Sequence, residues 1–386
     1  MIAAPENSLF VVRDDDQSTY RFHGSKPEIM LGFQHIYPQE RILNLGLNYR
    51  CEPPIVEAAM RLIAHNEERF PKKIRAGKSG KQKVRFQYFE DCYKENAFLA
   101  EDIRQTVQNG VPLSEIAVLF RTNMQPRALM EYMVSANLAF QTKDRIPYID
   151  EHWIARDFFT YIRIAQGSDS RADFLSIMNR PKRYIGRDSL PDETVCFDEW
   201  MKLYEEQPWI AERIEKLWYD LKHLSRLSPY AAINYIRRGI GYDDYLAEYA
   251  EYRNANKEDF YEVADEILAS AKGYRTFEEW FAHIEEYRQE LKRLAQEKRR
   301  NQNAVTFATL HSAKGLEFTK VYLIDVNEGV MPYKKAVLKQ DVEEERRLFY
   351  VGMTRAKESL TICSVKKMRG KKVELSRFIK EAGKEP

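Results

Sequence analysis

One arginine, Arg355, stands where a helix is predicted to end and a strand to begin. The preceding residues, 343–354, start with acidic side chains and continue with good helix formers, which favours a helix because acids stabilise its first turn. Residues 359–365 alternate polar and apolar side chains, a pattern typical of a half-buried strand. A rigid helix that ends beside a sheet would hold the guanidinium at a fixed place, where it can bind a phosphate group. Taken alone, the segment is better explained as a solvated, salt-bridged helix, because charged helices are common.

Three further segments carry polar side chains next to predicted strands. Residues 14–24 follow the apolar run 8–12, residues 47–50 read Leu-Asn-Tyr-Arg, and residues 309–318 lie between two apolar runs. In an open α/β sheet, ligands bind beyond the carboxyl ends of the strands, so strands that lead into polar loops suit a binding site. Together with residues 343–357, and in this order along the chain, these segments resemble motifs III, IV, V and VI of the UvrD/Rep-type superfamily 1 DNA helicases.

The resemblance implies catalytic roles for three residues at a bound ATP. Arg355 and Arg50 would contact the γ-phosphate, where an arginine can accelerate phosphoryl transfer by about 10³ to 10⁵. Gln17 would sense the same phosphate, since an amide both donates and accepts hydrogen bonds. The alternative for the two arginines is a surface ion pair.

The resemblance also places further residues at the nucleotide. Tyr49 would stack on adenine, and Glu317, in a loop with Gly315, would bind the nucleotide together with Arg50 and Arg355. The alternatives are a core tyrosine for Tyr49 and a helix N-terminal acid for Glu317. ATP and Mg²⁺ are the implied cofactors, and the metal ligands are expected in a preceding motor domain, so no metal ligand is assigned in this chain.

Contacts with single-stranded DNA and duplex junctions are implied as well. Aromatic side chains stack on bases of any sequence, at about 1–3 kcal/mol per base, and polar side chains bind the backbone. For Phe22, burial in a core is the alternative, and for the two glycines an ordinary turn between helices. The residues that the motifs place at DNA are Tyr20, Phe22 and His23; Arg121, Thr122 and Asn123 of motif IVa; His311, Ser312 and Lys314 of motif V; and Arg183, Gly239 and Gly241 in the helical part of the chain.

The first motif departs from the family pattern at four positions. The family usually has glycine at Arg13, isoleucine at Thr19, tryptophan at Phe22 and arginine at His23. Glycine permits a close approach of the backbone or an unusual φ, so Arg13 changes what this loop can adopt, and His23 removes a permanent positive charge from the DNA side. The departures at Arg13 and His23 favour the alternative function, a standalone DNA-binding or regulatory module that keeps the fold without catalysis.

The order of predicted elements indicates an α/β fold. A short helix is predicted within 24–38, a strand at 42–45 and a helix from Pro53 to about residue 68. Strands at 84–89 and 116–120 then alternate with helices, which favours a parallel sheet with crossover helices, whereas helices alone are predicted from 151 until sheet character resumes at 304. The resemblance implies a RecA-like domain 2A, an all-helical insertion domain 2B and a short remnant of domain 1A. The expected boundaries are 1–38 for the 1A remnant, 39–150 and 299–386 for the two parts of 2A, and 151–298 for 2B.

The amino-acid composition excludes several classes of protein. The chain has 386 residues, 44% hydrophobic and 31% charged, with a net charge of +2, so a nucleic-acid site must come from local clustering. Residues 69–85 hold eight Lys and Arg and no acid, and are interpreted as a solvated loop rather than a DNA contact. Four scattered cysteines argue against a zinc site or disulfides, and no apolar run is long enough to span a membrane. We expect a cytoplasmic monomer without membrane contacts.

The sequence contains no phosphate loop of the form Gly-x-x-x-x-Gly-Lys-Ser/Thr. Gly77-Lys78-Ser79 is a false match, because Lys72 stands where the first glycine belongs. There is also no apolar strand that ends in Asp-Glu for magnesium, and phosphoryl transfer needs both features. We therefore expect this chain to be the C-terminal part of an ATP-dependent 3′–5′ DNA helicase. Its first residue is expected to fall just before the last strand of domain 1A. This part is expected to be inactive alone and to work with a 1A/1B motor domain in cis or in trans.

Overall fold

The computed structural model describes residues 11–12, 14–17, 43–70, 72–144, 148–297 and 303–383, with the side chains of 294–297 left aside. Several sequence predictions lie outside these residues. They are the proposed DNA contacts Tyr20, Phe22 and His23, the positions Arg13 and Thr19 that differ from the family pattern, and the helix expected within 24–38. The described residues form two compact units, one within Met1–Ile146 and Lys292–Pro386 and the other within Pro147–Leu291.

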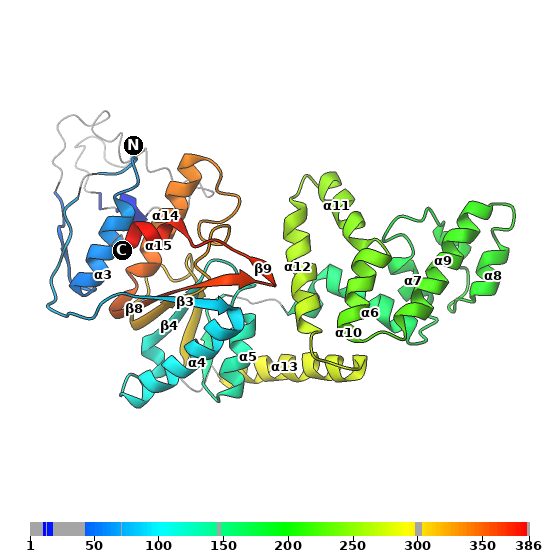
Figure 1. The fold of residues 1–386 in the computed structure, drawn as a ribbon, viewed down its shortest axis with the longest axis horizontal. Coiled ribbons are helices and arrows are strands. Elements are labelled where there is room, and N and C mark those ends of the chain that lie inside the picture. Colours follow the sequence, from blue (N-terminus) through cyan, green and yellow to red (C-terminus); the bar gives the residue numbers. More distant parts are fainter. Residues whose placement is uncertain are drawn as a thin grey trace, which may run out of the picture. The chain divides into compact units, whose positions relative to one another are not determined.

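The first unit is built on a parallel sheet with the strand order β3-β8-β7-β4-β6-β5, to which β9 is added as an antiparallel partner of β8 (Figure 1). In its centre, Val118 pairs with Phe307 on one side and with Tyr322 on the other. Two short strands, β1 (Leu47–Asn48) and β2 (Arg75–Ala76), pair separately in parallel. The strands of the main sheet are β3 (Arg85–Asp91), β4 (Ile116–Phe120), β5 (Phe140–Thr142), β6 (Val305–Thr309), β7 (Phe318–Leu323), β8 (Ala356–Met368) and β9 (Lys371–Lys372).

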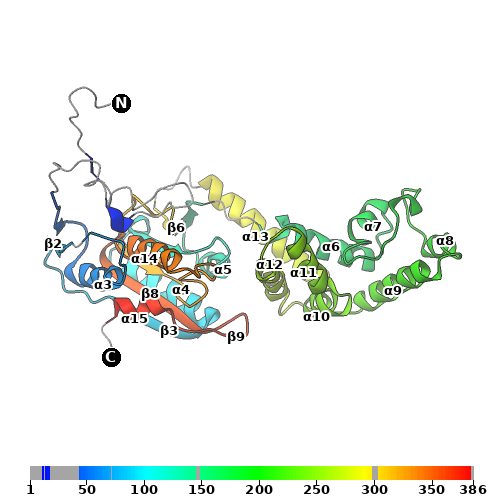
Figure 2. The ribbon, with the colours of Figure 1, turned by 90° about the horizontal axis from the view of Figure 1, so that it is seen from above.

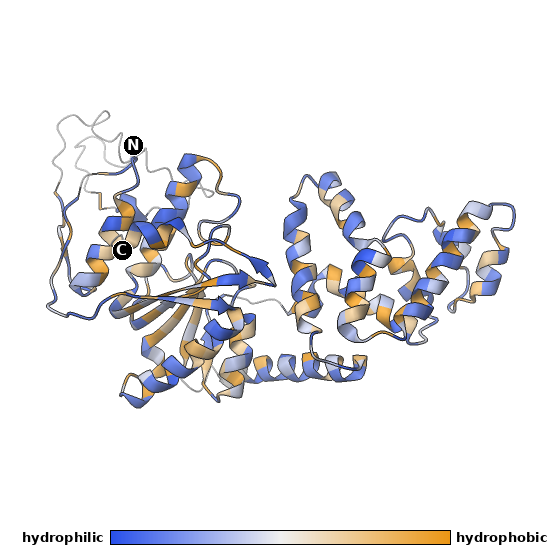
Figure 3. Cartoon of the chain, in the orientation of Figure 1, coloured by the Kyte–Doolittle hydropathy of each residue, from blue (hydrophilic) through white to orange (hydrophobic). Residues whose placement is uncertain are grey.

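Helices cover both faces of this sheet. Every residue of β4 is buried, as expected for a central parallel strand, and in Figure 3 the middle of the sheet is largely hydrophobic, whereas the ends of β8 and β9 are hydrophilic. Ala117 and Leu119 point into a core shared with three helices, whereas Ile116, Val118 and Phe120 alternate with them and face away from it. The helices on the first face are α3 (Pro53–Ile63), α14 (Lys339–Met353) and α15 (Arg377–Ala382), and α4 (Cys92–Gln108), with α5 (Arg127–Ser135) beside it, covers the other face.

The second unit is built of helices in its described residues, joined by loops and one isolated β-bridge between Ser170 and Thr194 (Figure 2). Its core is rich in aromatic side chains, among them Phe158, Tyr161, Tyr242 and Trp280. A π-helical turn, Tyr235–Gly239, follows α10. The helices are α6 (Trp153–Ala165), α7 (Arg171–Ile177), α8 (Phe197–Lys202), α9 (Pro208–Leu224), α10 (Pro229–Asn234), α11 (Tyr242–Tyr252), α12 (Lys257–Ser270) and α13 (Phe277–Glu297), of which α13 ends in the first unit.

The prediction of an α/β fold with a parallel sheet and a helical block is confirmed, and several local predictions are wrong. The strand expected at 42–45 lies instead at Leu47–Asn48, where β2 offers a partner, and the helix from Pro53 ends at Ile63 rather than near residue 68. Helix α5, strand β5 and helix α11 were not predicted. The last of these begins after Gly241, whose φ of +88° makes a left-handed turn that the helical periodicity does not reveal.

Candidate functional site

The parallel sheet sorts the predicted site residues into two groups. Glu317 and Arg355 immediately precede β7 and β8, so they lie at the amino edge of the sheet. Arg121 and Leu310 immediately follow β4 and β6, so they lie at the carboxyl edge. The residues expected at the nucleotide therefore gather at one edge, and those of motif IVa expected at DNA at the other.

An asparagine-capped turn presents Tyr49 and Arg50 at the amino edge. The side-chain oxygen of Asn48 accepts hydrogen bonds from the backbone amides of Arg50 and Cys51, both at 2.9 Å, a pattern that lets asparagine fix a turn. The ring of Tyr49 is 75% exposed, and a Cβ added at Gly77 would come within 3.1 Å of it. One flank of the ring therefore packs closely on backbone, and much of the rest is open for stacking.

Arg50 joins two of the predicted motifs. Its Nε donates to Oε2 of Glu317 at 2.9 Å, and its Nη1 lies 3.5 Å from the carbonyl oxygen of Thr354. Both charged side chains are partly exposed, and the Arg50 guanidinium lowers the pKa of Glu317. The structure thus brings together residues that are 267 positions apart in the chain.

Arg355 is buried behind this pair. Its guanidinium donates to the carbonyl oxygens of Val351, at 2.9 Å, and Leu316, at 3.1 Å. Burial, and next the nearby cation of Arg50, lower the pKa of Arg355 to about 10, so it is still protonated at neutral pH. Two cations are thus held close together, an arrangement that a bound anion would stabilise.

These residues surround an open pocket of about 540 Å³. Tyr49, Arg50 and Glu317, which were predicted to bind the nucleotide, line the pocket. Two lysines that were not predicted as ligands, Lys78 and Lys357, line it as well. Arg355 is not among the lining residues. Three cations and an exposed aromatic ring suit a ligand with a planar base and phosphate groups.

Gln17 also lines the pocket, at the end of the short turn η1 (Asp15–Gln17). Its Nε2 donates to Asp14 at 2.7 Å, and its carbonyl oxygen accepts a hydrogen bond from Lys314 at 2.8 Å. Lys314, predicted at DNA, therefore lies on the nucleotide side in this structure. The next residue, Gly315, has a φ of +89°, and a glycine adopts this conformation without the strain that a side chain would add.

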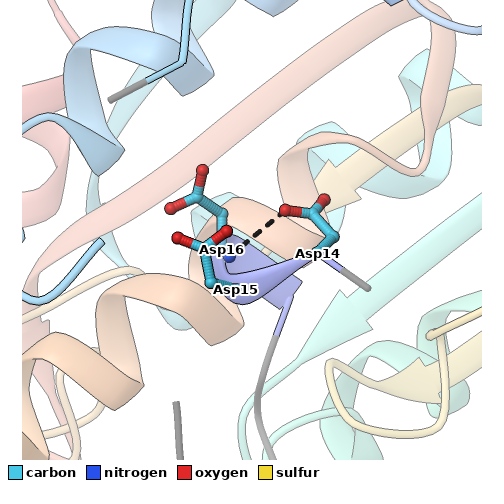
Figure 4. A group of neighbouring side chains, drawn as sticks. All are labelled: Asp14, Asp15 and Asp16. Carbon is cyan, nitrogen blue, oxygen red and sulfur yellow. Dashed lines mark hydrogen bonds between the residues drawn. The ribbon is translucent and has the colours of Figure 1, made fainter. Parts of the chain in front are cut away.

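Three carboxylates, those of Asp14, Asp15 and Asp16, lie close to one another (Figure 4). Two cations already offset most of their negative charge, because Lys72 pairs with all three and Arg69 donates twice to Asp16, at 2.9 and 2.8 Å. An ammonium group takes the place where a cation would bind, so this cluster does not fit Mg²⁺. The interpretation of 69–85 as a solvated loop is wrong at these two cations, whose side chains are only 12% and 16% exposed.

At the carboxyl edge, Arg121 is fixed by a carboxylate of α14. Its guanidinium donates through both Nε and Nη2 to Glu345, at 3.0 and 2.8 Å, and lies 5.1 Å from the centre of the Tyr333 ring. Thr122 follows it, and the side-chain oxygen of Asn123 is buried without a hydrogen-bond partner among the described residues. The motif IVa residues thus lie together at the strand end, with Arg121 already paired.

His311 and Ser312 lie beside them, after β6. Burial, and next the cation of Arg121, lower the pKa of His311, so it is neutral at physiological pH. The hydroxyl of Ser312 donates to Asp144, whose other oxygen accepts from the amide of Thr309 at 2.7 Å. Asp144 was not predicted as a site residue, and no pattern around it in the sequence indicates this role.

In the helical unit, the structure does not support Arg183 as a DNA contact. Its side chain is buried and donates to the carbonyl oxygens of Ile177, at 3.2 Å, and Met178, at 3.0 Å, which makes it a structural residue. Gly239 ends the π-helical turn, and the next amide donates to the carbonyl oxygen of Tyr235. Gly239 and Gly241 therefore form a tight connection between helices, and their contact with DNA stays a prediction.

A basic hairpin was missed in the sequence. Five of the seven residues in 366–372 are Lys or Arg, and they lie at the end of β8, in the turn after it and in β9, at the carboxyl edge. Lys366 and Lys367 share Glu90, which leaves a positive excess on an exposed loop. The charge run was visible in the sequence and could have been proposed as a phosphate contact.

Two buried carboxyl groups support the same edge. Asp325 follows β7 in a left-handed conformation, with a φ of 52°, and its amide donates to Glu95 of α4 at 3.2 Å. Burial, and next the charge of Asp325, raise the pKa of Glu95, and burial raises the pKa of Asp325. The thiol of Cys92 and the side chain of Gln125 contact Asp325, and the cation of Arg369 offsets part of its shift.

We expect Glu95→Gln to stabilise the first unit at pH 7–8. A carboxyl whose pKa is raised by folding gives its full stabilisation below its unfolded pKa, near 4.5, and loses it as pH rises towards the folded value. Each unit of that shift corresponds to about 1.4 kcal/mol. The gain of the variant over the wild type should therefore grow from pH 4 to pH 8, as measured by urea unfolding.

The signal should be circular dichroism, because all five tryptophans lie in the helical unit and do not report on this site. Glu101→Gln, on the same helix but partly exposed and with a lowered pKa, is the control and should show no such gain. A gain that is independent of pH would contradict the proposed titration of Glu95.

A parallel α/β unit accompanied by a helical unit is a fold that fits helicases. The family model described as the UvrD-like helicase C-terminal domain matches residues 43–195 and 210–367, and the chain therefore belongs to that family. YjcD of Bacillus subtilis is 29% identical over 98% of this chain. The ATP-dependent DNA helicases PcrA of Bacillus subtilis and Rep of Salmonella typhimurium are 30% and 28% identical over 93% and 96% of this chain.

The chain spans about half the length of the curated relatives it matches, 51% of YjcD and PcrA and 58% of Rep. No helix in the described part of the chain is long and apolar enough to cross a membrane.

Proposed function

We propose that this chain is the C-terminal part of an ATP-dependent DNA helicase that moves along single-stranded DNA in the 3′–5′ direction and separates duplexes. The pocket at the amino edge supplies one side of the nucleotide site. The carboxyl edge supplies part of the path for the DNA strand. The other side of the nucleotide site belongs to a 1A/1B motor domain, in cis or in trans.

The pocket is the observation that carries this proposal. Tyr49, Arg50 and Glu317 reach it from segments 267 residues apart, and Lys78 and Lys357 add positive charge. In the proposed complex, Tyr49 stacks on the base, and Arg50 and Arg355 stabilise charge on the γ-phosphate. Gln17 senses that phosphate. ATP fits these residues, whereas we assign Mg²⁺ to ligands outside the described residues, because the carboxylates of Asp14–Asp16 are already paired with Lys72 and Arg69.

The finer domain assignment belongs to the same proposal. The sheet unit is domain 2A, the helical unit is the inserted domain 2B, and residues 1–38 are the remnant of domain 1A. Single-stranded DNA lies along Arg121, Thr122, Asn123, His311 and Ser312, and the basic hairpin 366–372 approaches the duplex junction. We further propose that the protein acts as a monomer in the cytoplasm.

Unwinding by the chain joined to its preceding motor domain tests the function. Two partial duplexes are compared, one with a 3′ single-stranded tail and one with a 5′ tail, each labelled with a fluorophore and a quencher. We expect ATP-dependent strand release from the 3′-tailed substrate and little from the 5′-tailed one, because translocation starts on the single strand. Equal release from both would contradict the direction, and DNA binding with no release from either would favour a binding module without catalysis.

A further inference from the structure

We infer that Gln125 is the positioning residue of the carboxyl edge, and that it holds the Arg121–Thr122 backbone in the conformation that meets single-stranded DNA. The inference rests on the proposed function and names a residue that the motif comparison did not assign. Gln125 lies four residues after Arg121, in the loop between β4 and α5. It contacts no reacting group in this arrangement and acts only through its neighbours.

The amide of Gln125 joins two strand ends. Its Oε1 accepts hydrogen bonds from the backbone amides of Arg121 and Thr122, both at 2.8 Å. Its Nε2 donates to the carbonyl oxygen of Ile324 at 3.4 Å and to Oδ2 of Asp325 at 3.3 Å. One side chain therefore ties the end of β4 to the end of β7, because its amide group offers both the acceptor and the donor that this link needs.

The far end of this link is rigid. Asp325 is 6% exposed, its φ is 52°, and its backbone amide donates to the buried carboxyl of Glu95. A residue held in a left-handed conformation by its surroundings gives Gln125 a fixed anchor. The near end is the loop that the proposed function places at DNA.

Arg121 is consequently held at two places, its side chain by Glu345 and its backbone by Gln125. Glu345 binds its guanidinium and limits where the charge can lie. Gln125 binds its backbone and that of Thr122, and so sets where the loop leaves the sheet. Without Gln125, two amides at the strand end lose their acceptor, and Arg121 keeps its charge but loses its position relative to a phosphate.

The test measures binding of a fluorescent oligothymidylate to the whole chain at several salt concentrations. We expect Gln125→Leu to weaken binding about tenfold, the effect of losing a link worth about 1.4 kcal/mol. The slope of log K against log salt should shrink by about 0.7, as for one lost phosphate contact on a single strand. Gln105→Leu, an exposed glutamine on α4, is the control and should bind like the wild type.

A pair of substitutions that exchanges the donor and the acceptor between positions 125 and 325 tests whether Gln125 positions the loop or whether its loss merely disturbs the structure. Gln125→Glu keeps the acceptor for the two amides but sets a carboxylate against Asp325. Adding Asp325→Asn supplies a donor and restores the link in the reverse direction. We expect DNA affinity to fall in Gln125→Glu and to recover in the double variant. In an Arg121→Ala background, Gln125→Leu should cost less affinity than it does alone, because it acts partly through that residue.

The outcomes distinguish the inference from the proposed function. If the wild-type chain shows no binding even at low salt, the assignment of the carboxyl edge to DNA is overturned, and this inference with it. If the wild type binds and Gln125→Leu binds equally well with the same salt slope, only the role of Gln125 is overturned. An additive loss in the Arg121→Ala background would also overturn it.

Discussion

Arg355→Ala should lower DNA-stimulated ATP turnover by about 10³-fold or more in the chain joined to its motor domain. An arginine at the γ-phosphate stabilises charge in the transition state, and its loss cannot be offset by Arg50, which is shared with Glu317. Affinity for single-stranded DNA should change little, because the motif IVa residues lie at the opposite edge of the sheet. Phosphate release and oligonucleotide anisotropy measure the two effects separately.

A stability control is needed, because the guanidinium of Arg355 donates to the carbonyl oxygens of Val351 and Leu316. Truncation removes two hydrogen bonds to backbone carbonyls, a buried one to Val351 and a partly buried one to Leu316, at a cost of about 1–3 kcal/mol. Arg61→Ala is the matched variant, since Arg61 also donates to a backbone carbonyl, that of Ala382, but lies on α3 and does not line the pocket. Turnover near the wild-type value in Arg355→Ala would remove this residue from the nucleotide site.

The sequence predicted the elements whose signal is local. Strand β4 was predicted at Ile116–Phe120, where it lies, because an apolar run that ends in polar residues is unambiguous over five positions. Helix α14 and the strand after it were predicted from acidic residues and alternation. Strand β1 was misplaced, since two residues carry little pattern and its pairing with β2 depends on a distant segment.

The motifs named individual site residues, but their surroundings could not be predicted. No local pattern pairs Lys72 with Asp14–Asp16 or Glu345 with Arg121, because each pair forms only when the chain has folded. The burial of Arg183 was not evident for the same reason, because its partners, the carbonyl oxygens of Ile177 and Met178 and the hydroxyl of Tyr161, surround it only in the folded unit. Contacts that form only in the folded chain, with side chains or with backbone, are thus the part of a site that sequence patterns predict least well.

The 386-residue chain alone should show no ATP hydrolysis above that of its Arg355→Ala variant, with or without single-stranded DNA. The pocket offers a base-stacking ring and cations, but Lys72 replaces the glycine that would complete a phosphate loop at Gly77-Lys78-Ser79. Hydrolysis needs a loop that wraps the phosphates, a held metal ion and a positioned water, and the arginines supply none of these. The measurement is phosphate release, with PcrA of Bacillus subtilis as the positive control under the same conditions.

Each result of that measurement decides something different about the site. Absence of turnover, followed by its appearance when a 1A/1B motor domain is supplied, would make the pocket one half of a shared nucleotide site. Turnover by the chain alone that Arg355→Ala abolishes would mean that the chain binds phosphates without the glycine-rich loop, and our description of the nucleotide site would be wrong. Turnover that Arg355→Ala leaves unchanged would come either from this pocket without the help of Arg355 or from elsewhere, in another site or a contaminating enzyme, and Tyr49→Ala would separate these two cases. Loss of turnover in Tyr49→Ala would return the activity to this pocket and leave only the role of Arg355 in error.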